Sequence, residues 1–255
     1  MFFEYLKYRF KSGNAHSIHS PFVFEFYNNV FKSDLEDSCF EKIENQRNAL
    51  VNSTEEIHFI DLGAGSKKYK KAPRKISQIA NSSLKSKKWS RLIFRICRYY
   101  GCQNILELGT SLGITTSYLA FSKPESRIVT LEGSPEVAQL AKGVFDTLAL
   151  KNIEIVIGNI DDTLEIALKK MGTPDLIFFD ANHTYEATKS YFEKSLAYLS
   201  NDTCFVFDDI YWSKGMKKAW SEIQNHPQVR VSIDLFFIGI VFFRKESPKQ
   251  QFILR

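Results

Sequence analysis

From residue 104 onward, short apolar runs alternate with stretches in which apolar residues recur at helical spacing. Such alternation predicts a parallel sheet covered on both faces by helices. Two later runs, 229–234 and 236–244, are joined too tightly for a helical crossover, so the last strand is expected to run antiparallel. The predicted fold class is α/β, with a doubly wound, mostly parallel, seven-stranded sheet and an N-terminal helical arm. The earlier strands are expected at 104–108, 127–131, 153–157, 175–179 and 204–208, with helices beginning near residues 113, 135, 161, 184 and 214.

The N-terminal part has a different pattern, rich in aromatic and polar residues. There "SPFVFEFYNNVF" predicts a helix with Ser20 as its N-cap and Pro21 at its first position. We divide the chain into an N-terminal helical and basic region, 1–100, and a domain that carries the chemistry, 101–255. The first region is expected to pack on the core as a lid or scaffold.

Composition places the chain among ordinary globular proteins. It has 255 residues, of which 44% are hydrophobic and 25% charged. No apolar run approaches the ~18 residues that span a bilayer, and the charged start has no cleavage site, so we expect neither a membrane partner nor a signal peptide. The cysteines lack metal-type spacing and are interpreted as buried thiols in a reducing cytoplasm. They are Cys39, Cys97, Cys102 and Cys204.

The net charge of +5 hides a basic segment at 67–98, within an acid-free stretch between Asp61 and Glu107. Such a segment can hold nucleic-acid phosphates. However, "WSRLIFRICRYY" has the spacing of an amphipathic scaffold helix, and no RNA-recognition motif is present. A solvated basic face is therefore favoured over nucleic-acid binding. The cations are Lys67, Lys68, Lys70, Lys71, Arg74, Lys75, Lys85, Lys87, Lys88, Arg91, Arg95 and Arg98.

Two stretches have the form of a cofactor loop after a strand: "FIDLGAGS" at 59–66 and "NILELGTSLGI" at 104–114. In a doubly wound sheet, an acidic residue about 20 residues further on ends the second strand and takes the ribose hydroxyls. Glu132 meets this condition, 23 residues after Gly109, whereas "NSSLKSKK" follows the first loop at that distance. The second loop is therefore the predicted cofactor site, and the first, with Asp61, is predicted to be a turn.

The spacing "ELGTSLG" also selects the cofactor. Dinucleotide folds need G-x-G-x-x-G, and here Ser111 stands where a side chain would crowd a pyrophosphate. S-adenosylmethionine contains no pyrophosphate. With these residues, the stretch from 104 to about 243 resembles a class I S-adenosylmethionine-dependent methyltransferase, a Rossmann-like fold.

That resemblance implies the cofactor contacts. The loop after the first strand lines the methionine end, the second strand end holds the ribose, and "GNID" (158–161) borders the adenine. The implied cofactor residues are Glu107, Gly109, Thr110, Ser111, Gly113, Glu132, Gly133, Ser134, Asn159, Ile160 and Asp180.

Carboxylates follow the fourth and fifth strands, in "FFDANHTYE" and "FVFDDIYW". Asp180, Asp208 and Asp209 are expected to meet at one edge of the sheet, because ligands bind outside the carboxyl ends of parallel strands. Three carboxylates repel one another unless a cation joins them, and oxygen ligands suit Mg²⁺ or another hard divalent ion. His183 is then placed to take the proton of a substrate hydroxyl.

This arrangement resembles metal-dependent O-methyltransferases of the catechol and caffeoyl-coenzyme A type, and more closely macrolide-sugar O-methyltransferases. The catechol enzymes have a lysine where His183 stands and an asparagine at the position of Asp209. Simpler interpretations stay open. An aspartate such as Asp180 is common in methyltransferases of all kinds, Asp208 or Asp209 can cap the next helix, and His183 can be a helix-start residue without a chemical role.

The predicted function is S-adenosylmethionine-dependent O-methylation of a small hydroxylated acceptor, assisted by a divalent cation. The alternative is an RNA methyltransferase that uses the basic segment. A nicotinamide-dependent oxidoreductase is disfavoured by the loop spacing, and a homodimer is allowed for. His16 and His19 are interpreted as ordinary polar residues, with a substrate lid as the alternative. Tyr211 and Trp212 form either an aromatic wall for a planar substrate or part of the core.

Overall fold

The protein is described by a computed structural model that covers residues 2–58 and 73–255. These residues form two compact units. The central unit is residues 34–167, and the split unit combines residues 1–33 with residues 168–255. The first hundred residues are thus shared between both units, and the functional boundary at residue 100 stays a prediction.

The central unit has a sheet of three parallel strands in the order β3-β4-β5. The strands are β3 (Asn104–Leu108), β4 (Arg127–Glu132) and β5 (Ile153–Ile157). A short antiparallel pair, β1 (Glu56–Ile57) and β2 (Arg74–Lys75), lies apart from them in the chain. The helices of this unit are α3 (Cys39–Val51), α4 (Ile76–Ser83), α5 (Lys87–Tyr100), α6 (Ile114–Ser122) and α7 (Pro135–Thr147).

Aromatic side chains from four helices close the core of the central unit. Phe40 of α3 packs edge-to-face on Phe94 of α5, with ring centroids 4.9 Å apart. Phe40 also contacts Tyr118 of α6, and Phe145 of α7 belongs to the same buried cluster. The apolar stripe predicted for 89–100 is thereby confirmed for α5, whose buried residues include Leu92, Ile93 and Ile96.

The split unit has a mixed sheet of five strands in the order β10-β8-β9-β7-β6. β9 runs antiparallel to both β7 and β8, which confirms the predicted direction of that strand. β10, parallel to β8, was not expected, so among the described residues β3 to β10 make eight strands (five plus three) where seven were predicted. The strands are β6 (Leu176–Phe179), β7 (Cys204–Asp208), β8 (Val231–Asp234), β9 (Ile238–Phe242) and β10 (Gln250–Ile253).

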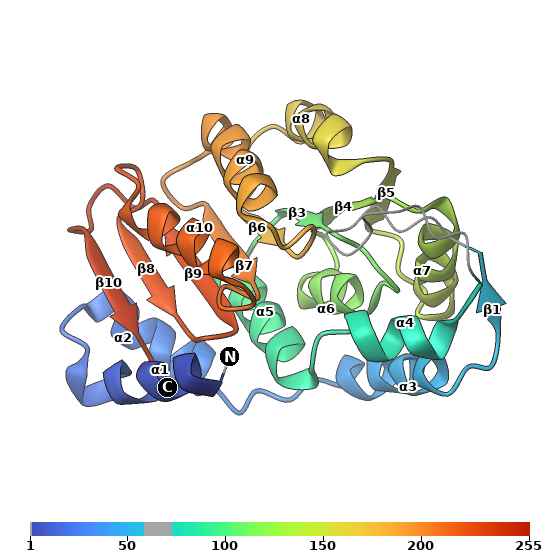
Figure 1. The fold of residues 1–255 in the computed structure, drawn as a ribbon, viewed down its shortest axis with the longest axis horizontal. Coiled ribbons are helices and arrows are strands. Elements are labelled where there is room, and N and C mark those ends of the chain that lie inside the picture. The colour runs from blue at the N-terminus through green and yellow to red at the C-terminus, as the bar shows by residue number, and fades with distance from the viewer. Residues whose placement is uncertain (1, 59–72) are drawn as a thin grey trace. The chain divides into compact units, whose positions relative to one another are not determined.

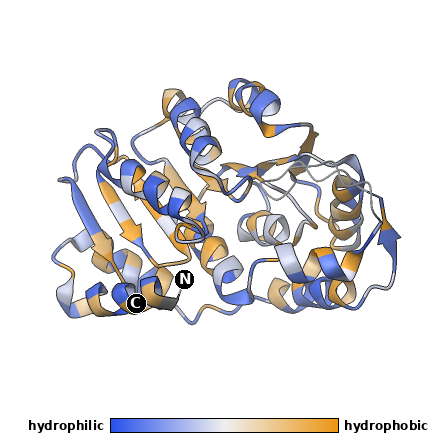
Figure 2. Ribbon diagram, viewed as in Figure 1, coloured by the Kyte–Doolittle hydropathy of each residue, from blue (hydrophilic) through white to orange (hydrophobic). Residues whose placement is uncertain are grey.

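Helices cover both faces of this mixed sheet (Figure 1). On one face, Trp220 lies so close to Gly239 of β9 that a Cβ there would be 2.7 Å from the indole ring. On the other face, Phe22 packs edge-to-face on Phe242, three residues further along β9. Figure 2 shows β8 and β9 as largely hydrophobic, as strands buried on both faces must be. The helices are α1 (Phe2–Lys11), α2 (Pro21–Phe26), α9 (Tyr185–Ser195) and α10 (Lys214–Asn225), with short 3₁₀-helices at Ala15–Ser17 and Leu196–Tyr198 and a π-helical segment at Tyr27–Phe31.

The predicted helix starts are confirmed to within one residue. Ser20 is the N-cap of α2 and accepts a hydrogen bond from Val23 N, with Pro21 first in the helix. α8 (Ile160–Met171) crosses the division between the units. No described helix is long and apolar enough to cross a membrane. All four cysteines are buried thiols, as predicted.

Candidate functional site

Glu132, at the end of β4, joins the three loops that follow the strands of the central unit. Its Oε2 accepts a hydrogen bond from Ser111 N at 2.9 Å, in the glycine loop after β3. Its Oε1 accepts one from Ser134 N at 3.0 Å. Its main-chain oxygen accepts one from Gly158 N at 2.9 Å, in the loop after β5. The predicted ribose-binding carboxylate is therefore held in place at the point where these loops meet.

The glycine loop has the backbone conformations that its sequence requires. Gly109 and Gly113 adopt φ of 101° and 78°, and Ser111 adopts φ of 49°. A Cβ at Gly113 would be 2.6 Å from the Phe145 ring, so only glycine fits where α6 begins. Thr110 is fixed below the loop, because its Oγ1 lies 2.7 Å from Thr130 Oγ1.

Glu107 is fully buried, and only one of its two carboxylate oxygens has hydrogen-bond partners. Its Oε2 accepts hydrogen bonds from the hydroxyls of Thr116 and Thr130, the latter at 2.7 Å. Its Oε1 has no hydrogen-bond partner among the described residues. Burial raises the pKa of the Glu107 carboxyl to about 7, although the threonine hydrogen bonds oppose the shift. A ligand cation at Oε1 would supply the missing partner and favour the ionised form.

The two threonines were missed from the sequence, although a signal for Thr130 was available. Glu107 and Thr130 are register partners across β3 and β4, so aligning "NILEL" with "RIVTL" puts them side by side. Other predicted residues have structural roles that the structure makes plain. Ser134 caps α7 by accepting from Val137 N, and Asn159 accepts from Asp161 N at 3.1 Å. Ile160 is buried.

The first glycine loop, 59–66, lies outside the described residues. It therefore stays a prediction that this loop is a turn and that Asp61 has no part in cofactor binding.

In the split unit, a second group of polar side chains gathers at the carboxyl ends of β6 and β7. Phe179 and Phe207 are register partners, so Asp180 and Asp208 follow at adjacent strand ends. His183 Nε2 lies 3.5 Å from Asp180 Oδ1. One ligand atom from each of Asp180, His183 and Asp208 lies within 4.8 Å of the other two, a spacing that a divalent cation can bridge with small adjustments.

One simpler interpretation, helix capping by the aspartates, does not account for this group, whereas the chemical role of His183 stays a prediction. α10 is capped by Ser213, whose side chain accepts from Met216 N, so Asp208 and Asp209 do not cap the next helix. α9 is capped by Thr184, so His183 precedes the helix. Asp209 is not part of the close group, and its φ of 52° turns the chain away from the strand. Its predicted role as a third metal ligand stays a prediction.

Tyr211 belongs to a packed aromatic cluster. Its ring stacks on Phe236 at 4.9 Å, and its hydroxyl donates to Asp234 Oδ2 at 2.8 Å. Asp234 also accepts from Trp220 Nε1, and burial raises the pKa of its carboxyl. Trp212, in contrast, is 62% exposed. Of the two aromatic residues, only Trp212 is free of the core to contact a ligand.

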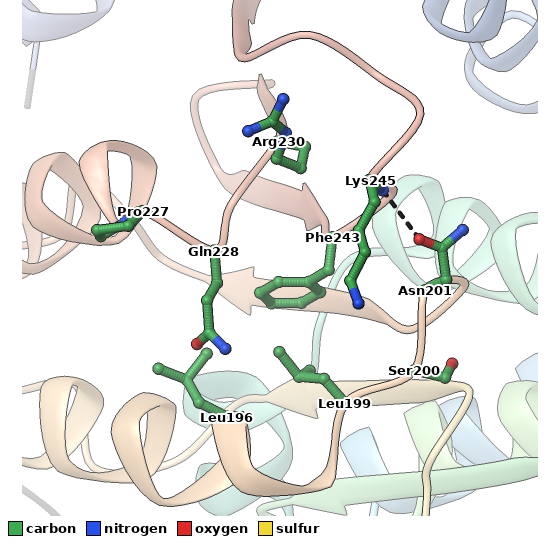
Figure 3. A pocket seen from close by; sticks show the side chains of 9 residues that line it. All are labelled: Leu196, Leu199, Ser200, Asn201, Pro227, Gln228, Arg230, Phe243 and Lys245. Carbon is green, nitrogen blue, oxygen red and sulfur yellow. Dashed lines mark hydrogen bonds between the residues drawn. The ribbon is translucent and has the colours of Figure 1, made fainter.

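Figure 3 shows one cavity of the split unit. Its lining residues lie at the strand ends opposite to those that carry the carboxylate group. It has a volume of about 390 Å³ and includes Leu199 and Asn201, before β7, and Phe243 and Lys245, after the antiparallel β9. Figure 3 shows the Lys245 side chain beside the Phe243 ring, with the Asn201 amide held against the Lys245 main chain. No predicted site residue lines this cavity. It is therefore not the place where the carboxylates act.

In the central unit, three cations of the basic segment pair with acidic residues. Arg91 and Arg98 of α5 contact Glu36 and Asp37 at 2.8 and 2.6 Å. Lys87 lies 3.3 Å from Glu44. Four of the lysines, at 67–71, lie outside the described residues. Among the described residues, the positive field is thus weaker than the sequence count suggests.

Residues 106–210 match a family model described as a methyltransferase domain. The chain is 31% identical over 126 residues to the catechol O-methyltransferase of Niastella koreensis, covering 48% of this chain and 55% of that protein. It is 34% identical over 76 residues to the tRNA (guanine-N(7)-)-methyltransferase of Mycoplasma mobile, covering 30% of this chain and 38% of that protein. The matches thus span only about half, or less, of the length of these curated relatives.

Among solved structures, the chain is similar to an O-methyltransferase from Bacillus cereus in complex with SAH. The TM-score is 0.59 at 20% identity, covering 82% of this chain and 92% of that one. Likeness at this identity concerns the fold. It confirms the predicted Rossmann-like α/β fold.

Proposed function

We propose that this chain, a class I S-adenosylmethionine-dependent methyltransferase by its fold and its matched domain, methylates an oxygen of a small hydroxylated molecule with the help of a divalent cation. The observation that carries the proposal is the close group of Asp180, His183 and Asp208. Methyl transfer to oxygen needs a deprotonated hydroxyl held in line with the donor. Two carboxylates and an imidazole at adjacent strand ends supply the groups for both tasks.

The residues of the central unit fit the cofactor. When bound, S-adenosylmethionine supplies a methyl group activated by a sulfonium. The buried, unpartnered Oε1 of Glu107 is a suitable acceptor for its ammonium group. Glu132 can accept the ribose hydroxyls while keeping its bonds to Ser111 and Ser134, because a carboxylate offers about four acceptor positions.

Glu132→Ala should weaken the binding of S-adenosylmethionine by roughly tenfold or more, since the ribose hydroxyls and two loop N–H groups would lose their acceptor. Isothermal titration calorimetry with S-adenosylmethionine measures this directly. Asp61→Ala, in the first glycine loop, is the matched control and should leave the affinity nearly unchanged. The reverse pattern would assign the cofactor to the first loop.

In the split unit, the residue types suggest which side chains would bind the metal and which would act as the base. Asp180 and Asp208 would hold the cation through their oxygens, which hard ions prefer. When bound, such a cation supplies Lewis acidity that lowers the pKa of a coordinated hydroxyl. His183, 3.5 Å from Asp180, would accept the hydroxyl proton at Nε2. Trp212 offers an exposed aromatic surface for a planar acceptor.

A second candidate, methylation of RNA, rests on the match to the tRNA methyltransferase of Mycoplasma mobile and on the basic segment. The ion pairs of Lys87, Arg91 and Arg98 with acidic residues favour the structural interpretation of that segment. We therefore rank the small-molecule acceptor first.

A further inference from the structure

One side of α1 carries a stripe of apolar side chains with large exposed areas. Phe10 is 90% exposed, Phe3 76% and Leu6 38%. At 100° per residue, these three positions fall within an arc of about 60° on one side of the helix. Large apolar side chains so exposed, and so aligned, indicate a contact surface rather than scattered surface residues.

The opposite side of α1 is what fixes the helix to the split unit. Tyr8 is buried, and its hydroxyl donates to the main-chain oxygen of Leu254. The Tyr5 ring packs edge-to-face on Phe236, with centroids 5.1 Å apart. Glu4 forms an ion pair with Lys217 at 2.7 Å. The stripe is therefore not the side through which α1 packs on the split unit, because the opposite side of the helix makes those contacts.

Cations flank the stripe. On the helical wheel, Lys7 lies on one side of it and Arg9 on the other, with Lys11 in the last turn. The single acidic residue of α1, Glu4, pairs with Lys217 at 2.7 Å and more loosely with Lys7 at 3.7 Å, so Arg9 and Lys11 are the cations of α1 that Glu4 does not contact. Arg255, whose guanidinium donates to the main-chain oxygen of Arg9, adds another positive charge to this region. Aromatic and leucine side chains between lysines and arginines are the pattern of a helix that lies in a membrane interface.

We propose that α1 binds the surface of an anionic membrane through Phe3, Leu6 and Phe10, with Lys7, Arg9 and Lys11 facing lipid headgroups. The sequence-based expectation of no membrane partner considered only spanning segments, and surface binding needs none. A second copy of this chain fits less well, because a two-fold contact would bring the cations of both stripes together. The inference is independent of the proposed chemistry.

The test is co-sedimentation of the full chain with vesicles of phosphatidylcholine containing about 30% phosphatidylserine. The wild type should bind them and bind pure phosphatidylcholine vesicles less. Phe10→Ser should lower the partition coefficient by roughly tenfold or more. The Phe10 side chain is 90% exposed in the free protein, and the substitution removes the apolar surface that the membrane would bury. Phe24→Ser, at a 45% exposed position on α2 of the same unit, is the matched control and should change little.

Reversing the charge of one lysine measures how much of the vesicle binding is electrostatic. Lys11→Glu should reduce binding to the phosphatidylserine vesicles and leave the weak binding to phosphatidylcholine unchanged. The proposal is overturned if the wild type does not sediment with anionic vesicles at low salt. It is equally overturned if Phe10→Ser binds like the wild type, or if light scattering shows a dimer that Phe10→Ser dissociates while vesicle binding is absent.

Discussion

His183→Ala should lower the turnover number for methyl transfer by roughly 10²–10⁴, the range expected for loss of a general base. The reason is geometric: Nε2 lies 3.5 Å from Asp180 Oδ1, at the strand ends where the acceptor hydroxyl would lie. The variant should still bind S-adenosylmethionine, because His183 is not among the implied cofactor residues. Steady-state kinetics and calorimetry together measure both quantities.

Two comparisons make this result specific. His16→Ala, at an exposed position between α1 and α2, is the matched control and should retain full turnover; a large loss there would instead support the lid interpretation of that histidine. Titration with Mn²⁺ separates a base from a ligand, because His183→Ala keeps metal affinity if the imidazole only accepts protons. If turnover stays within twofold of the wild type, the proposed base is wrong.

Asp180→Asn should abolish measurable metal binding and lower kcat/KM by roughly 10²–10³, as loss of Lewis-acid assistance worth several kcal/mol implies. The substitution keeps the size of the side chain and removes its negative charge, so the adjacent strand ends should remain intact. Binding of S-adenosylmethionine should persist, because Asp180 is assigned mainly to the acceptor side. Asp202→Asn, at a side chain that is 80% exposed in the same unit, is the control and should behave like the wild type.

A metal-independent enzyme would give a different pattern. Asp180→Asn would then retain most of its activity in both Mg²⁺ and EDTA, and His183 would have to activate the hydroxyl alone. If Asp209→Asn loses metal binding as Asp180→Asn does, Asp209 is the third metal ligand that the sequence predicted, although the close group does not include it.

Local signals in the sequence predicted much of the fold. Ser20 and Pro21 mark the start of α2 because a hydroxyl acceptor and a fixed φ both suit the first turn. The antiparallel β9 followed from a connection too short for a helix. β10 was missed because "QQFI" is short and half polar, and its pairing with β8 depends on long-range hydrogen bonds that no local pattern reveals.

The candidate site was predictable to a similar extent. The strand-end rule brought Asp180 and Asp208 together, since Asp180 follows β6 and Asp208 ends the neighbouring parallel strand β7. It did not separate Asp209, because no local pattern reveals its φ of 52° or its hydrogen bond from N to Phe237 O, a residue distant in the chain. Likewise, the burial of Tyr211 against Phe236 and Asp234 depends on a segment more than twenty residues away.

A labelling assay tests most directly the central claim, that the chain transfers a methyl group from S-adenosylmethionine to the oxygen of a small molecule. The full chain is incubated with methyl-labelled S-adenosylmethionine and either a panel of catechols, hydroxylated aromatics and sugars or unmodified tRNA, each with Mg²⁺ and with EDTA. We expect label on an oxygen of at least one small acceptor in Mg²⁺, its loss in EDTA, its return when Mg²⁺ is added back, and none on tRNA. Label on tRNA and on none of the small molecules would contradict the account.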